Sequence, residues 1–538
     1  MAVLQNPIIP GYYPDPSICR VDDDYYIACS SFELFPGIPI FHSRDLVHWE
    51  QIANVMTADN GFHMEANCGI GGLMAPTLRY HDGTFYMMNT NFADRGNYIV
   101  TAKDPAGPWS EIHWLDDIPG IDASLFFDND GQCYVMGTGN VWDNGTGVME
   151  RGIWVAKYDI EQYKIIGAPF TIWNSALRGA ASPEAPHLYH VGDYYYLLIA
   201  EGGTEHFHSV AVARSKDLFS FFEGFPGNPV LTHRHMGYHC PITNVGHADF
   251  VELPDGSWYA VFLGSRLIDG ACKNLGRETF ICPVIWERGW PMFSPETGKV
   301  EWTYPAPACL AEDICPPEQK RDGFDSAELP LYWTFWGTPY EKYWSIQDSC
   351  LKLRCIPQKA DDELRPMGFA PTVDKTAYRA FVARRQRQPK AQITTKMHFV
   401  PQGKETAGLL VVQAMNHQLH FVRCTEEGRQ LLRVFAVTCD FTSMPFIPGF
   451  SSKTQQHVVA EVGYDAADVV LRICMDGEDW KLFYGTEEVE LKELCAFDGH
   501  MINPEQVGCM VGTMLGMYAS GNGTDSQHTA AFDFFELV

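Results

Sequence analysis

Three acidic residues, Asp15, Asp122 and Glu184, occupy matched places near the starts of repeated segments and could carry out acid–base chemistry together. Hydrolysis of a glycosidic bond requires two carboxyl groups with separated pKa values. One group must be ionised to take a proton from water, and the other must be protonated to give a proton to the leaving oxygen. A third carboxylate nearby would raise the pKa of the acid by like-charge repulsion. These residue types indicate glycoside hydrolysis if the fold brings them together.

The elements that must position these residues are five repeated segments in the first 300 residues. Each has a small or acidic residue, a short apolar run, a turn and an aromatic-rich strand. The segments start at residues 15, 75, 122, 185 and 247, which gives spacings of 60, 47, 63 and 62 residues. Several turns are Asp-Gly pairs, such as Asp82-Gly83 and Asp130-Gly131. Asp-Gly between apolar runs predicts a type I′ hairpin, so each repeat is expected to open with a β-hairpin.

Repeats of this length, with no helical periodicity, predict an all-β protein that begins with a five-bladed β-propeller. Innermost strands of a propeller line its axis, so Asp15, Asp122, His247 and Glu184 (beside Ala185) should converge. A single aspartate next to Pro or Gly would more simply cap a turn. Three carboxylates in matched register instead favour a shared site. Phe32 follows the first hairpin, where its ring could bind a sugar face or pack in the core.

A second domain follows a Pro-rich stretch at residues 304–317. The predicted domains are therefore a propeller at residues 1–315 and an accessory β-sandwich, of the concanavalin-like jelly-roll type, at residues 316–538. Alternating runs such as Leu351–Cys355 and Ala391–Phe399 predict its strands, and Asp476-Gly477 marks a hairpin. The last strand is expected at Thr529–Leu537.

Composition limits the kinds of binding partner and the cellular locations to be expected. The 538 residues carry a formal net charge of −28, which disfavours nucleic acid and anionic membranes but permits neutral sugars. The 16 cysteines form no Cys-x-x-Cys pair and no zinc-like spacing, so we expect reduced thiols. No secretory signal and no apolar run of membrane-spanning length is visible. We therefore expect a cytoplasmic protein whose partner is an oligosaccharide.

Several long motifs, in a fixed order, resemble glycoside hydrolase family 43, in particular its two-domain β-xylosidase and α-L-arabinofuranosidase members. The resemblance covers nearly the whole chain. The motifs are Asn6–Ile18, Ser30–Gly37, His42–Trp49, Ile121–Phe126, Glu184–Tyr189, Ala200–Thr204 and, at the start of the sandwich, Arg321–Asp325.

This resemblance implies roles for the matching residues. Asp15 corresponds to the general base, Glu184 to the general acid, and Asp122 to the carboxylate that tunes and orients the acid. The family inverts the anomeric centre. His247 corresponds to a histidine near the axis and Arg277 to an arginine that reaches the sugar, a role suited to a permanently charged guanidinium.

Further expectations concern the substrate pocket and cofactors. Thr204, which ends the motif Ala200–Thr204, is expected to bind substrate, as is Met74, which stands where many relatives have an aromatic residue. The sandwich of two-domain relatives lends an aromatic to the pocket, and here Met510 or Met514 would have to fill that place. No cofactor is required. Some relatives bind Ca²⁺ near the axial histidine and others need none, and the sequence leaves this open.

The sequence thus predicts an inverting exo-glycosidase that releases a terminal α-L-arabinofuranosyl or β-D-xylosyl group from hemicellulose-derived oligosaccharides. An alternative is a non-catalytic sugar-binding propeller, although a lectin has no need of all three carboxylates. A retaining, fructan-acting propeller would carry an Asn-Asp-Pro-Asn segment, whereas this chain has Tyr13-Pro-Asp-Pro-Ser17. The preferred pentose and a homo-oligomeric state remain open.

Overall fold

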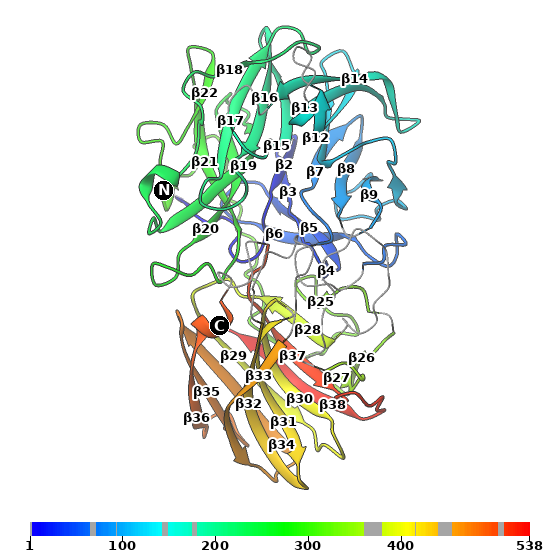
Figure 1. Ribbon diagram of the computed structural model, residues 1–538, viewed down its shortest axis with the longest axis vertical. Helices are drawn as coiled ribbons and strands as arrows, with labels where there is room; N and C mark the ends of the chain where they lie inside the picture. Colours follow the sequence, from blue (N-terminus) through cyan, green and yellow to red (C-terminus); the bar gives the residue numbers. More distant parts are fainter. Residues whose placement is uncertain are drawn as a thin grey trace.

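The computed structural model describes residues 3–64, 71–92, 94–142, 149–174, 180–339, 341–359, 379–414, 416–439, 454–503 and 510–538. Figure 1 shows two stacked β bodies, an N-terminal propeller and a C-terminal sandwich. In these ranges the regular structure is strand apart from two short 3₁₀ helices, η1 (Arg234–Met236) and η3 (Gly499–Ile502). No helix in the described ranges has the length and apolar character needed to cross a membrane. The predicted all-β class is therefore confirmed.

The described part of the propeller contains five four-stranded antiparallel sheets, one for each sequence repeat. The first four sheets comprise β2 (Ser17–Val21), β3 (Asp24–Ala28), β5 (Gly37–Ser43) and β6 (Glu50–Met56); β7 (Thr77–His81), β8 (Thr84–Asn91), β9 (Gly96–Ala102) and β10 (His113–Trp114); β11 (Ile121–Phe127), β12 (Cys133–Trp142), β13 (Met149–Asp159) and β14 (Lys164–Asn174); and β15 (Glu184–Val191), β16 (Tyr194–Glu201), β17 (Ser209–Ser215) and β18 (Glu223–Gly224). The fifth comprises β19 (Ile242–Glu252), β20 (Trp258–Arg266), β21 (Glu278–Glu287) and β22 (Trp290–Phe293).

The propeller ring closes through the inner strands. Strand β2 contacts β7, β7 contacts β11, β11 contacts β15, β15 contacts β19, and β19 returns to β2. Outside the blades, β1 (Val3–Gln5) pairs with β23 (Thr303–Pro305) and ties the start of the propeller to its end. The hairpin prediction holds at Asp82-Gly83, where both residues have positive φ, as a type I′ turn requires. At Asp130-Gly131 the turn is longer, and of this pair only the glycine has positive φ.

A shared backbone irregularity marks the positions that converge on the axis. Asp15, Asp122, Ala185 and His247 have φ between 52° and 55°, a conformation that non-glycine residues rarely adopt. The pairing register also shifts at this point in the third, fourth and fifth blades. Such a bulge re-aims side chains that would otherwise alternate across the sheet. The repeated strain therefore turns these residues toward one place.

The sandwich consists of two facing antiparallel sheets that enclose an apolar core. One sheet comprises β24 (Arg321–Asp322), β26 (Trp344–Gln347), β27 (Cys350–Arg354), β29 (Lys390–His398), β34 (Asp468–Asp476), β35 (Asp479–Gly485), β36 (Lys492–Asp498) and β38 (Thr529–Leu537). The other comprises β25 (Thr334–Trp336), β28 (Ala380–Arg385), β30 (Thr406–Ala414), β31 (His417–Glu426), β32 (Arg429–Cys439), β33 (Thr454–Gly463) and β37 (Met514–Ser520). The final strand has the predicted bounds.

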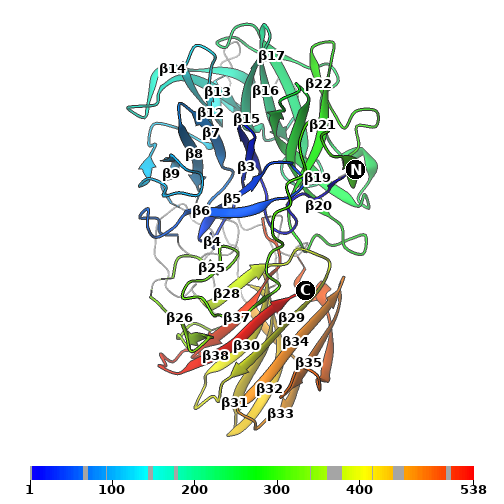
Figure 2. The ribbon, with the colours of Figure 1, turned by 180° about the vertical axis from the view of Figure 1, so that it is seen from behind.

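The two domains share a sheet. Strand β4 (Leu34–Phe35), in the loop after the first hairpin, pairs with β25 and extends the sandwich sheet into the propeller. Next to this junction Trp336 Nε1 donates to the buried carboxylate of Glu33 at 3.0 Å. Figure 2 shows from behind how β4 and β25 lie at the boundary between the two bodies. The loop that carries Phe32 is therefore held by the sandwich as well as by its own blade.

Candidate active site

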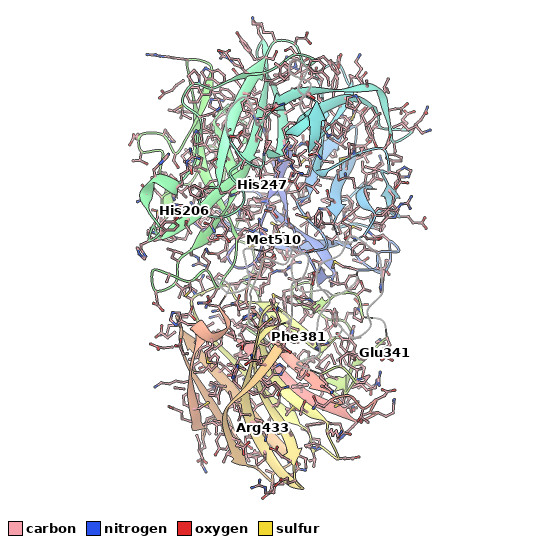
Figure 3. All side chains as sticks on the ribbon, in the orientation of Figure 1. His206, His247, Glu341, Phe381, Arg433 and Met510 are labelled. Atoms are coloured by element: carbon pink, nitrogen blue, oxygen red, sulfur yellow. The ribbon has the colours of Figure 1, made fainter. Side chains whose placement is uncertain are left out.

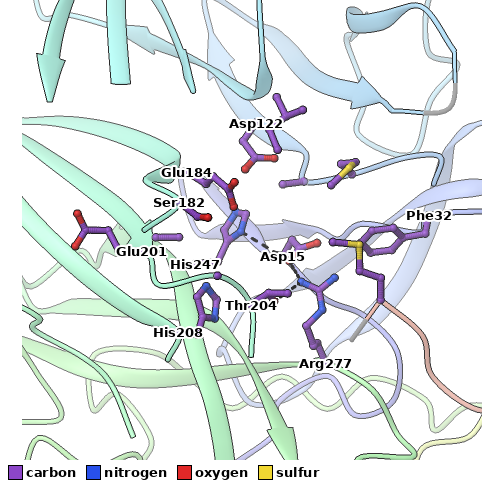
Figure 4. A pocket seen from close by; sticks show the side chains of 16 residues that line it. Asp15, Phe32, Asp122, Ser182, Glu184, Glu201, Thr204, His208, His247 and Arg277 are labelled. Carbon is purple, nitrogen blue, oxygen red and sulfur yellow. Dashed lines mark hydrogen bonds and ion pairs between the residues drawn. The ribbon is translucent and has the colours of Figure 1, made fainter. Parts of the chain in front are cut away.

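All eight residues that the sequence predicted for the site line one pocket of about 190 Å³. It opens where the inner strands converge and reaches the domain boundary (Figure 4). Its lining comprises Asp15, Phe32, Met74, Ala75, Ile121, Asp122, Ser182, Glu184, Ala200, Glu201, Gly203, Thr204, His208, His247, Arg277 and Met510. The fold thus assembles residues from all five blades and one residue of the sandwich around a small space.

Asp15 is a buried carboxylate held by hydrogen-bond donors. Arg277 Nη1 donates to Asp15 Oδ1 at 2.8 Å, and Ser30 Oγ donates to Asp15 Oδ2 at 2.5 Å. Arg277 Nη1 also lies 3.0 Å from Thr204 Oγ1, and its guanidinium stands over the ring of Phe32 at 5.3 Å. Charge-assisted hydrogen bonds of this kind are short and directional. The orientation of the Asp15 carboxylate is therefore fixed from two sides.

Glycine at position 276 allows Arg277 to reach this place. Gly276 has φ of +74°, and a Cβ there would lie only 2.4 Å from the carbonyl oxygen of Val511 in the sandwich. A side chain would force the two domains apart at this contact. The backbone before Arg277 therefore passes close to the sandwich while the arginine points into the propeller.

Asp122 and Glu184 are acidic groups whose pKa values are raised by their surroundings. Burial, together with the charges of Glu184 and Asp15, raises the pKa of Asp122 well above its usual range. Burial also raises the pKa of Glu184, with a contribution from Asp15, although Arg151 acts in the other direction. Acidic groups that lie close to other carboxyl groups in a confined space hold a proton more readily. The pair can therefore hold and supply a proton.

Two buried histidines complete the polar wall. Burial lowers the pKa of His247, and it lowers the pKa of His208 to about 3, which favours the neutral form of each ring. His247 Nδ1 lies 3.7 Å from Asp15 Oδ1, which is too long for a strong hydrogen bond. His208 Nδ1 lies 2.9 Å from the carbonyl oxygen of Asn244, which fixes that ring. His247 is thus both buried in the propeller and part of the pocket lining.

Apolar side chains from both domains form the remaining walls. Phe32 packs in an interdomain cluster with Tyr12 and also lines the pocket. Backbone hydrogen bonds join Phe32 to Leu73, next to Met74. Met510 enters from the sandwich, and its carbonyl oxygen accepts from Tyr12 OH at 2.6 Å. Figure 3 shows Met510 between the two domains, below His247.

Of the two sandwich methionines considered from the sequence, the structure selects Met510. Met514 is buried at the start of β37 and faces a separate small cavity at the domain boundary. Met510, in contrast, lines the pocket that holds the carboxylates. A thioether of the sandwich therefore occupies a wall of the candidate site.

The axis below the pocket is filled by a buried ion pair. Arg79 Nη1 donates to Asp249 Oδ2 at 3.0 Å, and Arg79 Nη2 donates to Asp249 Oδ1 at 3.2 Å. Ser17 and Tyr189 also donate to Asp249, and Arg79 Nη2 lies 2.9 Å from His187 Nδ1. Burial alone would raise the pKa of Asp249, but Arg79 outweighs it and holds that pKa well below its usual range. The network joins four blades.

These contacts do not fit a calcium ion next to His247. Calcium prefers a shell of several oxygen ligands. The nearby carboxylate of Asp15 is already engaged by Arg277 and Ser30. The cation of Arg79 reaches His187, whose ring centroid is 6.5 Å from that of His247. In the described ranges no group of three or more His, Cys, Asp or Glu residues could hold a metal ion.

Four polar residues near the carboxylates were not predicted from the sequence. Glu201 is buried, lines the pocket and accepts from Trp173 Nε1 at 3.1 Å. It belongs to the motif Ala200–Thr204, which was the available signal. Ser182 and His208 also line the pocket. Arg151 Nη2 donates to Glu184 Oε1 at 3.0 Å, and no motif in the sequence marked it.

Comparison with known proteins agrees with this geometry. Residues 4–291 match the model of glycosyl hydrolases family 43, and residues 321–538 match the β-xylosidase C-terminal concanavalin A-like domain. A xylosidase/arabinosidase of Butyrivibrio fibrisolvens is 38% identical, covering 100% of this chain and 99% of the relative. The non-reducing end α-L-arabinofuranosidase BoGH43B of Bacteroides ovatus is 36% identical, covering 99% of this chain and 94% of the relative.

A solved structure described as Bacteroides ovatus xyloglucan PUL GH43B superimposes with a TM-score of 0.87 at 34% identity and covers 100% of both chains. Sequence and structure therefore agree over the propeller and the sandwich alike. The chain is a glycosidase and belongs to glycoside hydrolase family 43.

Proposed function

We propose that this protein is an inverting exo-glycosidase that releases one terminal pentose, α-L-arabinofuranosyl or β-D-xylosyl, from hemicellulose-derived oligosaccharides. The observation that carries the proposal is the convergence of three carboxyl groups in one pocket with different surroundings. Asp15 is a carboxylate fixed by Arg277 and Ser30, while burial raises the pKa values of Asp122 and Glu184. Such a pair supplies the base and the acid that glycosidic hydrolysis needs.

In the proposed reaction Asp15 is the general base. It takes a proton from a water molecule that attacks the anomeric carbon, and the carbon–oxygen bond to the leaving group breaks on the opposite face. Glu184 gives its proton to the leaving oxygen, so the products are the inverted pentose and a shortened alcohol. Asp122 is proposed to tune and orient Glu184, and the two groups interact, since the charge of Glu184 adds to burial in raising the pKa of Asp122. All steps use side chains of this chain and water.

The size of the pocket supports exo action. Its volume of about 190 Å³ is below the usual range of ~300–1,000 Å³ for ligand pockets and suits a single sugar ring. Met510 and Phe32 give the apolar faces on which a ring can pack, and Arg277 offers donors for its hydroxyl groups. The two named relatives act on xylosides and arabinosides or on non-reducing end α-L-arabinofuranosides by their descriptions, which supports a terminal pentose.

The test is to compare rates of the purified protein on 4-nitrophenyl β-D-xylopyranoside and 4-nitrophenyl α-L-arabinofuranoside. Turnover of either pentoside is expected, and the ratio of rates identifies the preferred sugar. Glu184→Ala should abolish hydrolysis of the matching pentose disaccharide, whose leaving alcohol needs a proton, and should retain pentose binding, measured by calorimetry. Absence of turnover on both pentosides, or an unchanged disaccharide rate for Glu184→Ala, would overturn the proposal. We also propose a cytoplasmic location, to be tested by cell fractionation.

A further inference from the structure

The ion pair between Arg151 and Glu184 has no counterpart among the roles assigned so far. Arg151 lies in β13, outside the residues that line the pocket, and its Nη2 donates to Glu184 Oε1 at 3.0 Å. The side chain of Arg151 is 45% exposed and that of Glu184 is 28% exposed. The contact therefore lies toward the solvent side of the pocket. The ion pair of Asp15 with Arg277 differs, since both of its side chains are 5% exposed.

The pairing has a geometric consequence for proton transfer. A guanidinium donates hydrogen bonds and accepts none, so Glu184 Oε1 must act as an acceptor. When Glu184 is protonated in this arrangement, its proton resides on Oε2. The arginine thus selects one of the two carboxyl oxygens and fixes the rotation of the group. A general acid must present its proton along one direction to the leaving oxygen.

We propose that Arg151 is a positioning residue for the general acid, holding Glu184 by Oε1 so that Oε2 carries the proton delivered to the leaving group. This inference rests on the proposed role of Glu184. It assigns Arg151 to the leaving-group side of the site, because it contacts the residue that protonates the leaving oxygen. Two carboxyl groups face Glu184 from other elements, Asp122 of β11 and Asp15 before β2. The cation of Arg151 lowers the pKa of Glu184, whereas the charge of Asp15 raises it.

The balance of these charges predicts how pH affects the reaction. Arg151 favours the ionised form of Glu184, whereas burial and Asp15 favour the protonated form. Loss of Arg151 therefore raises the pKa of Glu184, and the acid stays protonated to higher pH. The alkaline limb of the kcat/KM profile, which reports loss of the acid's proton in the free enzyme, should move upward.

The test uses Arg151→Met and Arg151→Lys in the full-length protein. Two substrates are compared, the 4-nitrophenyl pentoside that the unaltered protein cleaves faster and the matching pentose disaccharide. Nitrophenolate leaves with little protonation, but a sugar alcohol needs a well-aimed acid. For Arg151→Met we expect the alkaline limb to rise by roughly half to one pH unit. We also expect the disaccharide rate to fall about tenfold more than the nitrophenyl rate.

Arg151→Lys keeps the charge, so its alkaline limb should lie closer to that of the unaltered protein. Arg95→Met is the matched control, because Arg95 is also an exposed arginine, paired through Nη2 with Asp116 Oδ2 at 2.6 Å, but outside the pocket lining. An unmoved alkaline limb together with equal losses on both substrates would overturn the role of Arg151. Failure of the unaltered protein to cleave any pentoside would instead refute the proposed function, so the two failures are distinguishable.

Discussion

Arg277 contacts both Asp15 and Thr204 across the pocket, since its Nη1 lies 2.8 Å from Asp15 Oδ1 and 3.0 Å from Thr204 Oγ1. The arginine follows Gly276, which packs against the sandwich, while Asp15 lies ahead of the first blade's inner strand. One side chain thus links the proposed base to the first blade, the fourth blade and the domain boundary. The orientation of Asp15 therefore depends on a residue that lies 262 positions away in the sequence.

Arg277→Lys should lower kcat/KM by about 10²-fold, because one ammonium group cannot reproduce the planar fork that serves Asp15 and Thr204. The measurement is steady-state kinetics on a 4-nitrophenyl pentoside, with thermal unfolding to check the fold. Arg44→Lys, an exposed arginine paired with Asp24 on the first blade, is the control and should keep full activity. Retention of kcat/KM within a factor of two in Arg277→Lys would show that the fork is not needed.

Asp122→Asn should move the alkaline limb of kcat/KM to lower pH, in the direction opposite to Arg151→Met. Asp122 and Glu184 repel each other when both are ionised, and the charge of Glu184 adds to burial in raising the pKa of Asp122. A neutral amide removes this repulsion, so the pKa of Glu184 falls and the acid loses its proton earlier. The pH dependence of kcat/KM measures the effect. A limb that stays in place or moves upward would contradict the proposed tuning role.

Arg79→Met should destabilise the fold strongly. Asp249 is fully buried, and without Arg79 its charge would remain without its main counter-ion on the propeller axis. Removal of one member of a buried ion pair typically costs about 3–5 kcal/mol. Denaturant unfolding measures the loss. Lys216→Met breaks an exposed pair with Asp193 and should change the unfolding free energy little. Equal effects of the two substitutions would show that the axial network does not stabilise the propeller.

Met510→Ala should raise KM for the pentoside while kcat changes less, because the side chain forms an apolar wall and does not take part in proton transfer. Loss of about 1 kcal/mol of apolar contact corresponds to a KM rise of roughly fivefold. Its backbone contact with Tyr12 is retained by the substitution. Met501→Ala, an exposed methionine of the sandwich, is the control. A selective fall in kcat with unchanged KM would argue against a binding role for this wall.

The sequence predicted the parts of this molecule that depend on local pattern. Repeat spacing gave the five blades, and matched register placed Asp15, Asp122 and Glu184 in one pocket. The strained φ that aims Asp15 and Asp122 comes from packing of the blades and leaves no pattern in the sequence. Arg151 meets Glu184 only because β13 and β15 lie in adjacent blades, 33 residues apart in the chain.

The contacts between the two domains could not be predicted from the sequence either. Pairing of β4 with β25 joins Phe35 to Phe335, and short apolar runs carry no information about such distant partners. The choice of Met510 rather than Met514 likewise depended on the direction in which each side chain points. Local pattern therefore predicted the three carboxylates of the pocket, whereas the arginines that contact them required either a family resemblance, for Arg277, or the structure itself, for Arg151.

The central claim is that Asp15 directs water to the face opposite the leaving group that Glu184 protonates. Proton NMR of the first sugar released from a 4-nitrophenyl pentoside tests this most directly, because it identifies the anomer before mutarotation. From β-D-xylopyranoside the mechanism predicts that α-D-xylose appears first, and from α-L-arabinofuranoside that the β anomer appears first. Initial release of the anomer that matches the substrate would contradict the mechanism, since it requires a covalent intermediate and a nucleophile in place of the base.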